Sequence, residues 1–224
     1  MYLISLGYLR GAEVIGETSF TLLVDKEETF PWSRYGFKLH VPRRALPSGV
    51  TQCQISVKAC LSGLFQFPEG STLVSGVYCI TTPHTFIQPL TIEIQHCVSI
   101  THPDQCSNLA FVVAKCTQEE LPYNFTVLSK GQFAVQSSFG SVSVHHFSLF
   151  GIIQWVLGEQ PTRCCARVFY IPKSVNSWKM DFVITKDIAI YNTVSIHDNS
   201  LIPRLRGNEA TTKVIVGIFS WWNE

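Results

Sequence analysis

Apolar residues recur at every second position in four short stretches of this 224-residue chain. Phe37, Leu39 and Val41, for example, alternate with polar residues. A β-strand points successive side chains to opposite faces of its sheet, so a period of two is typical of a strand with one buried face. We therefore expect strands in the stretches 37–41, 54–58, 90–95 and 141–145.

Two denser apolar runs, 109–113 and 147–156, predict strands that are covered on both faces. Turn sequences separate the expected strands, among them Leu46-Pro47-Ser48-Gly49 and Pro68-Glu69-Gly70-Ser71. No stretch combines the 3.6-residue apolar period of a long amphipathic helix with the capping residues of its ends. Many short strands joined by such turns predict an all-β protein, in the form of an antiparallel β-sandwich.

A second, smaller β-rich unit is expected after the turn at 158–161. Residues 164–170 and 181–185 again have the composition of strands. Near the end of the sequence Trp221 and Trp222 are adjacent and need a covering surface. Either the sheet is completed locally, or the sequence is a fragment or a truncated gene product.

Charge and apolar content exclude several classes of partner. Seventeen basic and sixteen acidic residues give a formal charge of +1, which lacks the basic excess of a nucleic-acid-binding protein. No apolar run approaches the roughly 18 residues of a membrane-spanning helix, so direct membrane insertion is not expected. The first residues lack the basic segment of a secretory signal, and we expect a cytoplasmic location.

The eight cysteines lie in strand-like sequence, and we expect them to be reduced and buried. His96, Cys97, His102 and Cys106 have the residue types of a metal site, but their positions fit strand ends and loops better. No glycine-rich nucleotide-binding motif occurs. The sequence therefore predicts no metal and no cofactor.

Three sequence markers resemble the ZU5 family, the module of zonula occludens proteins, netrin receptors and ankyrins. The markers are the stretch 35–50, which contains Pro42-Arg43-Arg44-Ala45-Leu46-Pro47-Ser48-Gly49, the stretch 73–78, and Gln88-Pro89-Leu90-Thr91-Ile92-Glu93-Ile94-Gln95-His96-Cys97. The resemblance implies a ZU5 β-sandwich over residues 35–157, after an N-terminal extension at 1–34. The stretch from Arg163 to Ile196 resembles part of a UPA domain, which often follows ZU5 in netrin receptors, ankyrins and PIDD-type proteins. We therefore expect a partial UPA-like domain over residues 158–224.

This resemblance implies a non-enzymatic scaffold or interaction module in cytoplasmic, death-domain-type signalling, with protein partners. The alternative it leaves open is an adaptor of the ankyrin type, with cytoskeletal partners. Arg43 and Arg44 form a small basic pair within the first marker. The pair is either a solvated turn or a contact for an acidic partner surface.

The triplet His146-Phe147-Ser148 is the most chemically suggestive motif of the chain. Some ZU5–UPA proteins resembling this one cut themselves between Phe and Ser of such a triplet. In that chemistry the Ser148 hydroxyl attacks the carbonyl of Phe147 to form an ester, His146 accepts the hydroxyl proton, and water hydrolyses the ester. The opposing interpretation is an inert strand with Phe147 in the core.

Strand geometry restricts this mechanism. In an ideal strand His146 and Ser148 share a face but lie about 7 Å apart, too far for a direct hydrogen bond. A bulge or sharp bend at Phe147 is needed to bring the two side chains together. Cleavage would be a single turnover and would not make the protein an enzyme.

Overall fold

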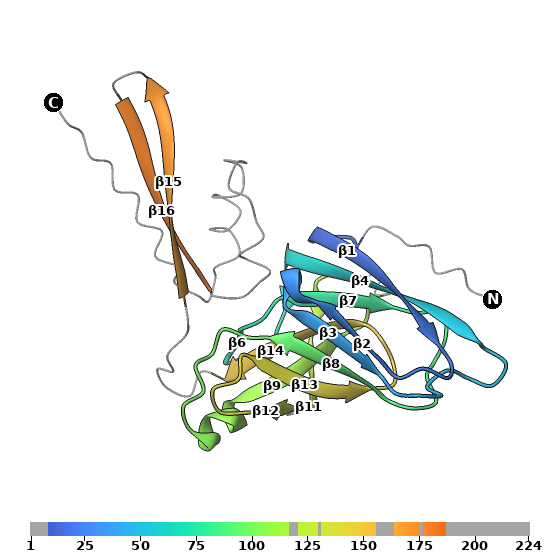
Figure 1. Cartoon of the computed structure of the whole chain (residues 1–224). Coiled ribbons are helices and arrows are strands. Elements are labelled where there is room, and N and C mark those ends of the chain that lie inside the picture. Colours follow the sequence, from blue (N-terminus) through green and yellow to red (C-terminus); the bar gives the residue numbers. More distant parts are fainter. Residues whose placement is uncertain (1–8, 117–120, 130, 156–163, 175–176, 187–224) are drawn as a thin grey trace.

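The computed structural model describes residues 9–116, 121–129, 131–155, 164–174 and 177–186. Within these residues nearly all regular structure is β, and two short 3₁₀ helices, Ser33–Tyr35 and Pro103–Asn108, are the exceptions. The prediction of an all-β antiparallel sandwich is confirmed (Figure 1). In this part of the chain no helix has the length and apolar content needed to cross a bilayer.

The larger sheet has seven strands, all joined by antiparallel pairing. Along the sheet the order is β1 (Ala12–Leu23), β4 (Gln52–Gly63), β7 (Val77–Thr81), β14 (Leu149–Trp155), β9 (Leu109–Ala114) and β11 (Thr126–Ser129), while β6 (Ser71–Leu73) also pairs with β14. β14 therefore has partners on both of its edges.

The smaller sheet has five strands, which are also antiparallel. Its order is β12 (Gln132–Phe133), β13 (Phe139–Val144), β8 (Leu90–Gln95), β3 (Phe37–Val41) and β2 (Glu28–Trp32). A separate short pair, β5 (Phe65–Gln66) and β10 (Tyr123–Asn124), is parallel.

The two sheets pack on each other through the main core. In β3 and β8 the alternation read from the sequence is the burial pattern of the structure, with Phe37, Leu39, Ile92 and Ile94 fully buried. These side chains meet inward-facing residues of the larger sheet, such as Ile55. The period of two therefore identified the inner face correctly.

The larger sheet is covered on its other face as well. In β9, Phe111 belongs to the main core, whereas Val112 belongs to a second apolar cluster. Tyr123 and Phe125 are buried in that second cluster, against the outer face of the sheet. This two-sided burial confirms the prediction for 109–113 and explains why that run is continuously apolar.

The predicted turns occupy the ends of these strands. Gly49 and Gly70, in two of the turn sequences, have φ of 83° and 72°. Only glycine adopts this left-handed region without steric cost, which accounts for its place in both turns.

The folded unit begins before residue 35. β1 and β2 both lie within residues 12–32, and they pair with β4 and β3 respectively. The domain boundaries expected at 34/35 and 157/158 remain predictions. The sandwich that the structure describes draws its first strands from the stretch expected to be an extension.

The two strands expected in the second unit are present. β15 (Cys164–Ser174) and β16 (Ser177–Lys186) form an antiparallel hairpin of their own. The assignment of this hairpin to a UPA-like domain stays a prediction. Trp221 and Trp222 lie outside the described residues.

The packing predicts a large difference between two isoleucine-to-alanine substitutions. Ile92 is fully buried at the centre of β8, whereas Ile87 is 62% exposed in the loop before that strand. Ile92→Ala should lower the free energy of unfolding by about 2–5 kcal/mol through lost burial and a residual cavity. Ile87→Ala should change it by less than about 0.5 kcal/mol, and equal effects of the two in urea titrations would contradict the described core.

Candidate functional site

The His146-Phe147-Ser148 triplet lies where the chain passes from one sheet to the other. β13 ends at Val144 in the smaller sheet, and β14 begins at Leu149 in the larger one. The four residues between them form a bend without regular structure. The prediction that the strand starts at Phe147 is therefore corrected, because a chain that changes sheets must leave one ladder before it joins the next.

Phe147 anchors this bend to the core. Its ring is partly buried and meets the ring of Phe86 edge-on, with 5.5 Å between the centroids and 77° between the planes. The side chain is thus used for packing, as the inert interpretation of the motif requires, yet the backbone around it is bent, as the cleavage hypothesis requires.

Ser148 is held from both sides. Its hydroxyl donates a hydrogen bond to the carbonyl of Ala114 and accepts one from the backbone N–H of Cys116 at 3.1 Å. Its own carbonyl accepts a hydrogen bond from the N–H of Ile80 at 2.8 Å. Ser148 therefore ties the end of β9 to β7 at the point where β14 enters the sheet.

The histidine of the triplet takes no part in this network. His146 and its neighbour His145 are exposed. Among the described residues, no hydrogen bond joins either imidazole to Ser148. The bend thus keeps Phe147 and Ser148 at one place but leaves the expected base apart from the hydroxyl.

A cysteine that the sequence did not single out lies at the hydroxyl instead. The thiol of Cys116 is hydrogen-bonded to the thiol of Cys79 and to the side chain of Ser148, and these bonds lower its pKa to about 7, against the opposing effect of burial. The bond to Cys116 and burial raise the pKa of Cys79. No local sequence signal marks Cys116, because its neighbours come from strands far apart in the chain.

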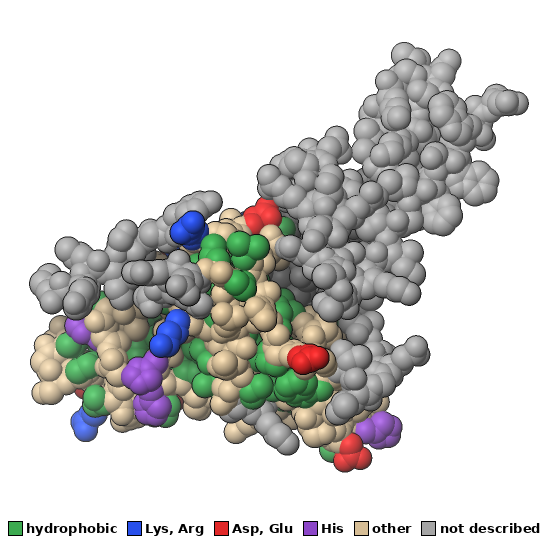
Figure 2. Space-filling view, turned by 180° about the vertical axis from the view of Figure 1, so that it is seen from behind, with side chains coloured by type: hydrophobic (Ala, Val, Ile, Leu, Met, Phe, Trp, Pro, Cys, Tyr) green, Lys and Arg blue, Asp and Glu red, His purple; other side chains and the backbone are tan. Residues whose placement is uncertain are grey.

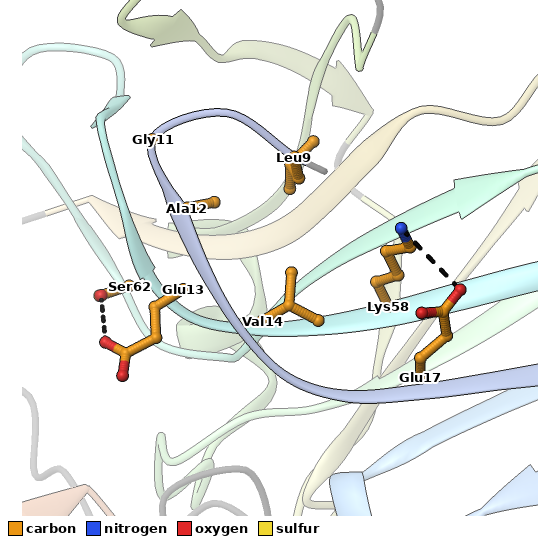
Figure 3. A pocket seen from close by; sticks show the side chains of 8 residues that line it. All are labelled: Leu9, Gly11, Ala12, Glu13, Val14, Glu17, Lys58 and Ser62. Carbon is orange, nitrogen blue, oxygen red and sulfur yellow. Dashed lines mark hydrogen bonds and ion pairs between the residues drawn. The ribbon is translucent and has the colours of Figure 1, made fainter. Parts of the chain in front are cut away.

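Two further features have less to offer as a site. A hollow beside the start of β1 and the end of β4 carries Glu13, Glu17, Lys58 and Ser62 (Figure 3). There Ser62 donates to Glu13 at 3.1 Å and Lys58 lies 3.8 Å from Glu17, so these polar groups satisfy one another. Within the described ranges, no group of three or more His, Cys, Asp or Glu residues is placed to hold a metal ion.

The basic pair of the first marker is presented at one end of the sandwich. Arg43 and Arg44 are exposed, and among the described residues neither forms a salt bridge. Arg44 has a φ of 58°, and its N–H donates to the carbonyl of Val24 at 2.7 Å. Ile87 lies beside the same turn, because its N–H donates to the carbonyl of Ala45 at 2.9 Å.

The lowered pKa of Cys116 predicts a pH-dependent alkylation near neutrality. The thiolate is the reacting form, so labelling by iodoacetamide should accelerate as the pH rises through about 7 and then level off. Cys60, whose pKa burial raises to about 12, should stay unlabelled. Peptide mapping after brief labelling measures each cysteine, and a Cys116 rate that rises only near the ordinary value of 9.0 would contradict the described contacts.

A comparison with protein families supports part of the resemblance. Residues 29–111 match the family model of the ZU5 domain. The match runs from β2 into β9 and includes all three sequence markers. ZU5 domains generally mediate contacts between proteins. No curated protein matches the chain at a significant level.

Proposed function

We propose that this chain is a non-enzymatic protein-interaction module of ZU5–UPA type that acts in cytoplasmic, death-domain-type signalling. The observation that carries the proposal is the ZU5 match, which falls on strands of both sheets of the sandwich. The β15–β16 hairpin supplies the first strands of the UPA-like part in this proposal. An ankyrin-type adaptor to the membrane skeleton is the alternative.

The binding surface in this proposal is the turn that carries Arg43 and Arg44, with Ile87 beside it. Two guanidinium groups without salt bridges to described residues suit an acidic protein surface, and the exposed Ile87 adds apolar area. On the face shown in Figure 2, few charged side chains are visible among the described residues. A non-glycine residue at positive φ costs about 1–2 kcal/mol, which is a further reason to look for a function at Arg44.

Binding assays separate the two versions of this proposal. The purified chain is passed over immobilised death domains and over immobilised spectrin repeats. Retention by death domains alone supports the signalling role, and retention by spectrin repeats alone supports the adaptor. Retention should weaken as the salt concentration rises, since exposed charges are screened.

Arg44→Gly provides a sharp test of the basic pair. Glycine accepts a φ of 58° without strain, so the free energy of unfolding should stay the same or rise by up to about 1 kcal/mol. Binding to the retained partner should fall, because one guanidinium is removed. Arg10→Gly outside the turn is the charge-matched control, and an unchanged affinity for Arg44→Gly would remove this surface from the proposal.

Self-cleavage between Phe147 and Ser148 is a second candidate function, favoured by the bend at 145–148. The Ser148 oxygen would attack the Phe147 carbonyl carbon, and its proton would pass to a base while the peptide nitrogen is released and protonated. The base predicted from sequence is His146. In the described conformation the titratable group at the hydroxyl is Cys116, with a pKa lowered to about 7.

Ser148→Ala tests this candidate directly. The wild-type chain should give two bands on a denaturing gel, from residues 1–147 and 148–224, and Ser148→Ala a single band. Ser143→Ala, at an exposed position of β13, is the matched control and should leave both bands. Thermal unfolding of Ser148→Ala shows whether the loss of its hydrogen bonds has disturbed the fold. A single full-length wild-type band would overturn self-cleavage without affecting the interaction role.

The proton acceptor is identified by two more variants. His146→Gln should slow cleavage if the exposed imidazole swings onto the hydroxyl, and Cys116→Ser should slow it if the thiolate takes the proton. Because His146 is exposed, its substitution should leave stability nearly unchanged.

A further inference from the structure

Three neighbouring strands bring two cysteines onto one face of the larger sheet. Leu149 of β14 is opposite Cys79 of β7 on one side and opposite Ala114 of β9 on the other. Cys116 follows Ala114 by two residues. Cys79, Ala114 and Leu149 are all buried in the second apolar cluster, and Cys116 packs against the same cluster.

The two side chains face the same apolar cluster. Cys79 and Cys116 share a thiol–thiol hydrogen bond, and both are free cysteines. Ser148 fixes the end of β9 beside them, since its hydroxyl accepts the N–H of Cys116 at 3.1 Å and its carbonyl accepts the N–H of Ile80, the residue after Cys79. Hydrogen bonds from the backbone to Ser148 therefore position the chain next to both cysteines.

The two thiols differ in exposure and in acidity. Cys79 is only 4% exposed, whereas Cys116 is partly exposed at the edge of the cluster. The pKa of Cys116 is lowered to about 7 by its hydrogen bond to Cys79, which leaves a large fraction as thiolate at neutral pH. An accessible thiolate beside a second, buried thiol is the usual arrangement of a redox-sensitive pair.

We propose that Cys79 and Cys116 form an intramolecular disulfide when the protein meets hydrogen peroxide. The Cys116 thiolate attacks one peroxide oxygen, the O–O bond breaks, and the departing hydroxide is protonated to water. The Cys79 sulfur then attacks the sulfur of the resulting sulfenic acid, the S–O bond breaks, and the hydroxide takes up the Cys79 proton. Two thiols are oxidised by two electrons in all, and one peroxide is reduced to two waters.

The other four cysteines of the sandwich are less suited to this reaction. Cys60 lies in the same cluster, but it is buried and its pKa is raised to about 12. Cys53 and Cys97 belong to the main core and not to the second apolar cluster. Cys106 is partly exposed but donates to the carbonyl of Phe133, away from the pair.

The bond would join β7 to the segment that follows β9, at the point where β14 begins. The disulfide would fix the end of β9, which supplies the hydrogen-bond partners of the Ser148 hydroxyl. The oxidised protein should accordingly unfold at a higher temperature than the reduced protein, and dithiothreitol should reverse the shift.

The test uses the full chain, reduced, freed of reductant and then treated with a moderate excess of hydrogen peroxide. Intact mass should fall by two hydrogen atoms, and peptide mapping without reduction should recover a peptide pair linked through Cys79 and Cys116. Linkage of a different pair, or a gain of oxygen with no linked peptides, would overturn the proposal.

Variants keep the result interpretable. Cys79→Ala should leave Cys116 as a sulfenic acid that dimedone labels, formed more slowly because the hydrogen bond that lowers the pKa of Cys116 is lost. Cys116→Ser should abolish both the linked pair and the label. Cys106→Ser replaces another partly exposed cysteine and should retain the Cys79–Cys116 bond. If Cys79→Ala fails to fold, mapping of the wild-type chain still decides between the outcomes, and loss of the bond in Cys106→Ser would contradict the assignment.

Discussion

The requirement that the larger sheet be covered on both faces governs this structure. Alternate residues of β9 and β14 enter the main core and the second apolar cluster. The smaller sheet covers one face, and the segment around Tyr123 and Phe125 covers the other. Either cover alone would leave half of these side chains in water, at roughly 25 cal/mol for each Å² of apolar area left exposed.

The same requirement places the reactive groups. Because β13 and β14 belong to different sheets, the chain bends between them, and Ser148 has to satisfy backbone groups that no strand pairing reaches. The hydroxyl thereby acquires contacts with the end of β9, where Cys116 meets Cys79. Ser148, which stabilises the backbone, and the Cys79–Cys116 pair therefore lie together at the edge of the second apolar cluster.

The period-two alternation of apolar residues predicted strands such as 37–41 and 90–95. In these strands the apolar residues occupy the inward face and the polar residues the outward face. The alternation did not predict β1. That strand lies at the edge of its sheet. Its burial alternates from Glu17 to Leu23, but polar Thr18 occupies one of the half-buried positions, so the apolar residues do not alternate over a long stretch. The residue types of the motif at 146–148 were enough to identify it, but they did not predict its contacts in the structure. They depend on the register of β7, β14 and β9, which joins residues distant in sequence.

The central place of β14 has a mechanical consequence for any scission at residue 147. The fragment that begins with Ser148 would start with β14, which pairs with β9 along one edge and with β7 along the other. Dissociation would then demand extraction of a middle strand, with rupture of both ladders at once, instead of peeling from a border. A nicked molecule should therefore persist as an interlocked pair until an unfolding force, such as a processive unfoldase pulling from one terminus, separates its halves.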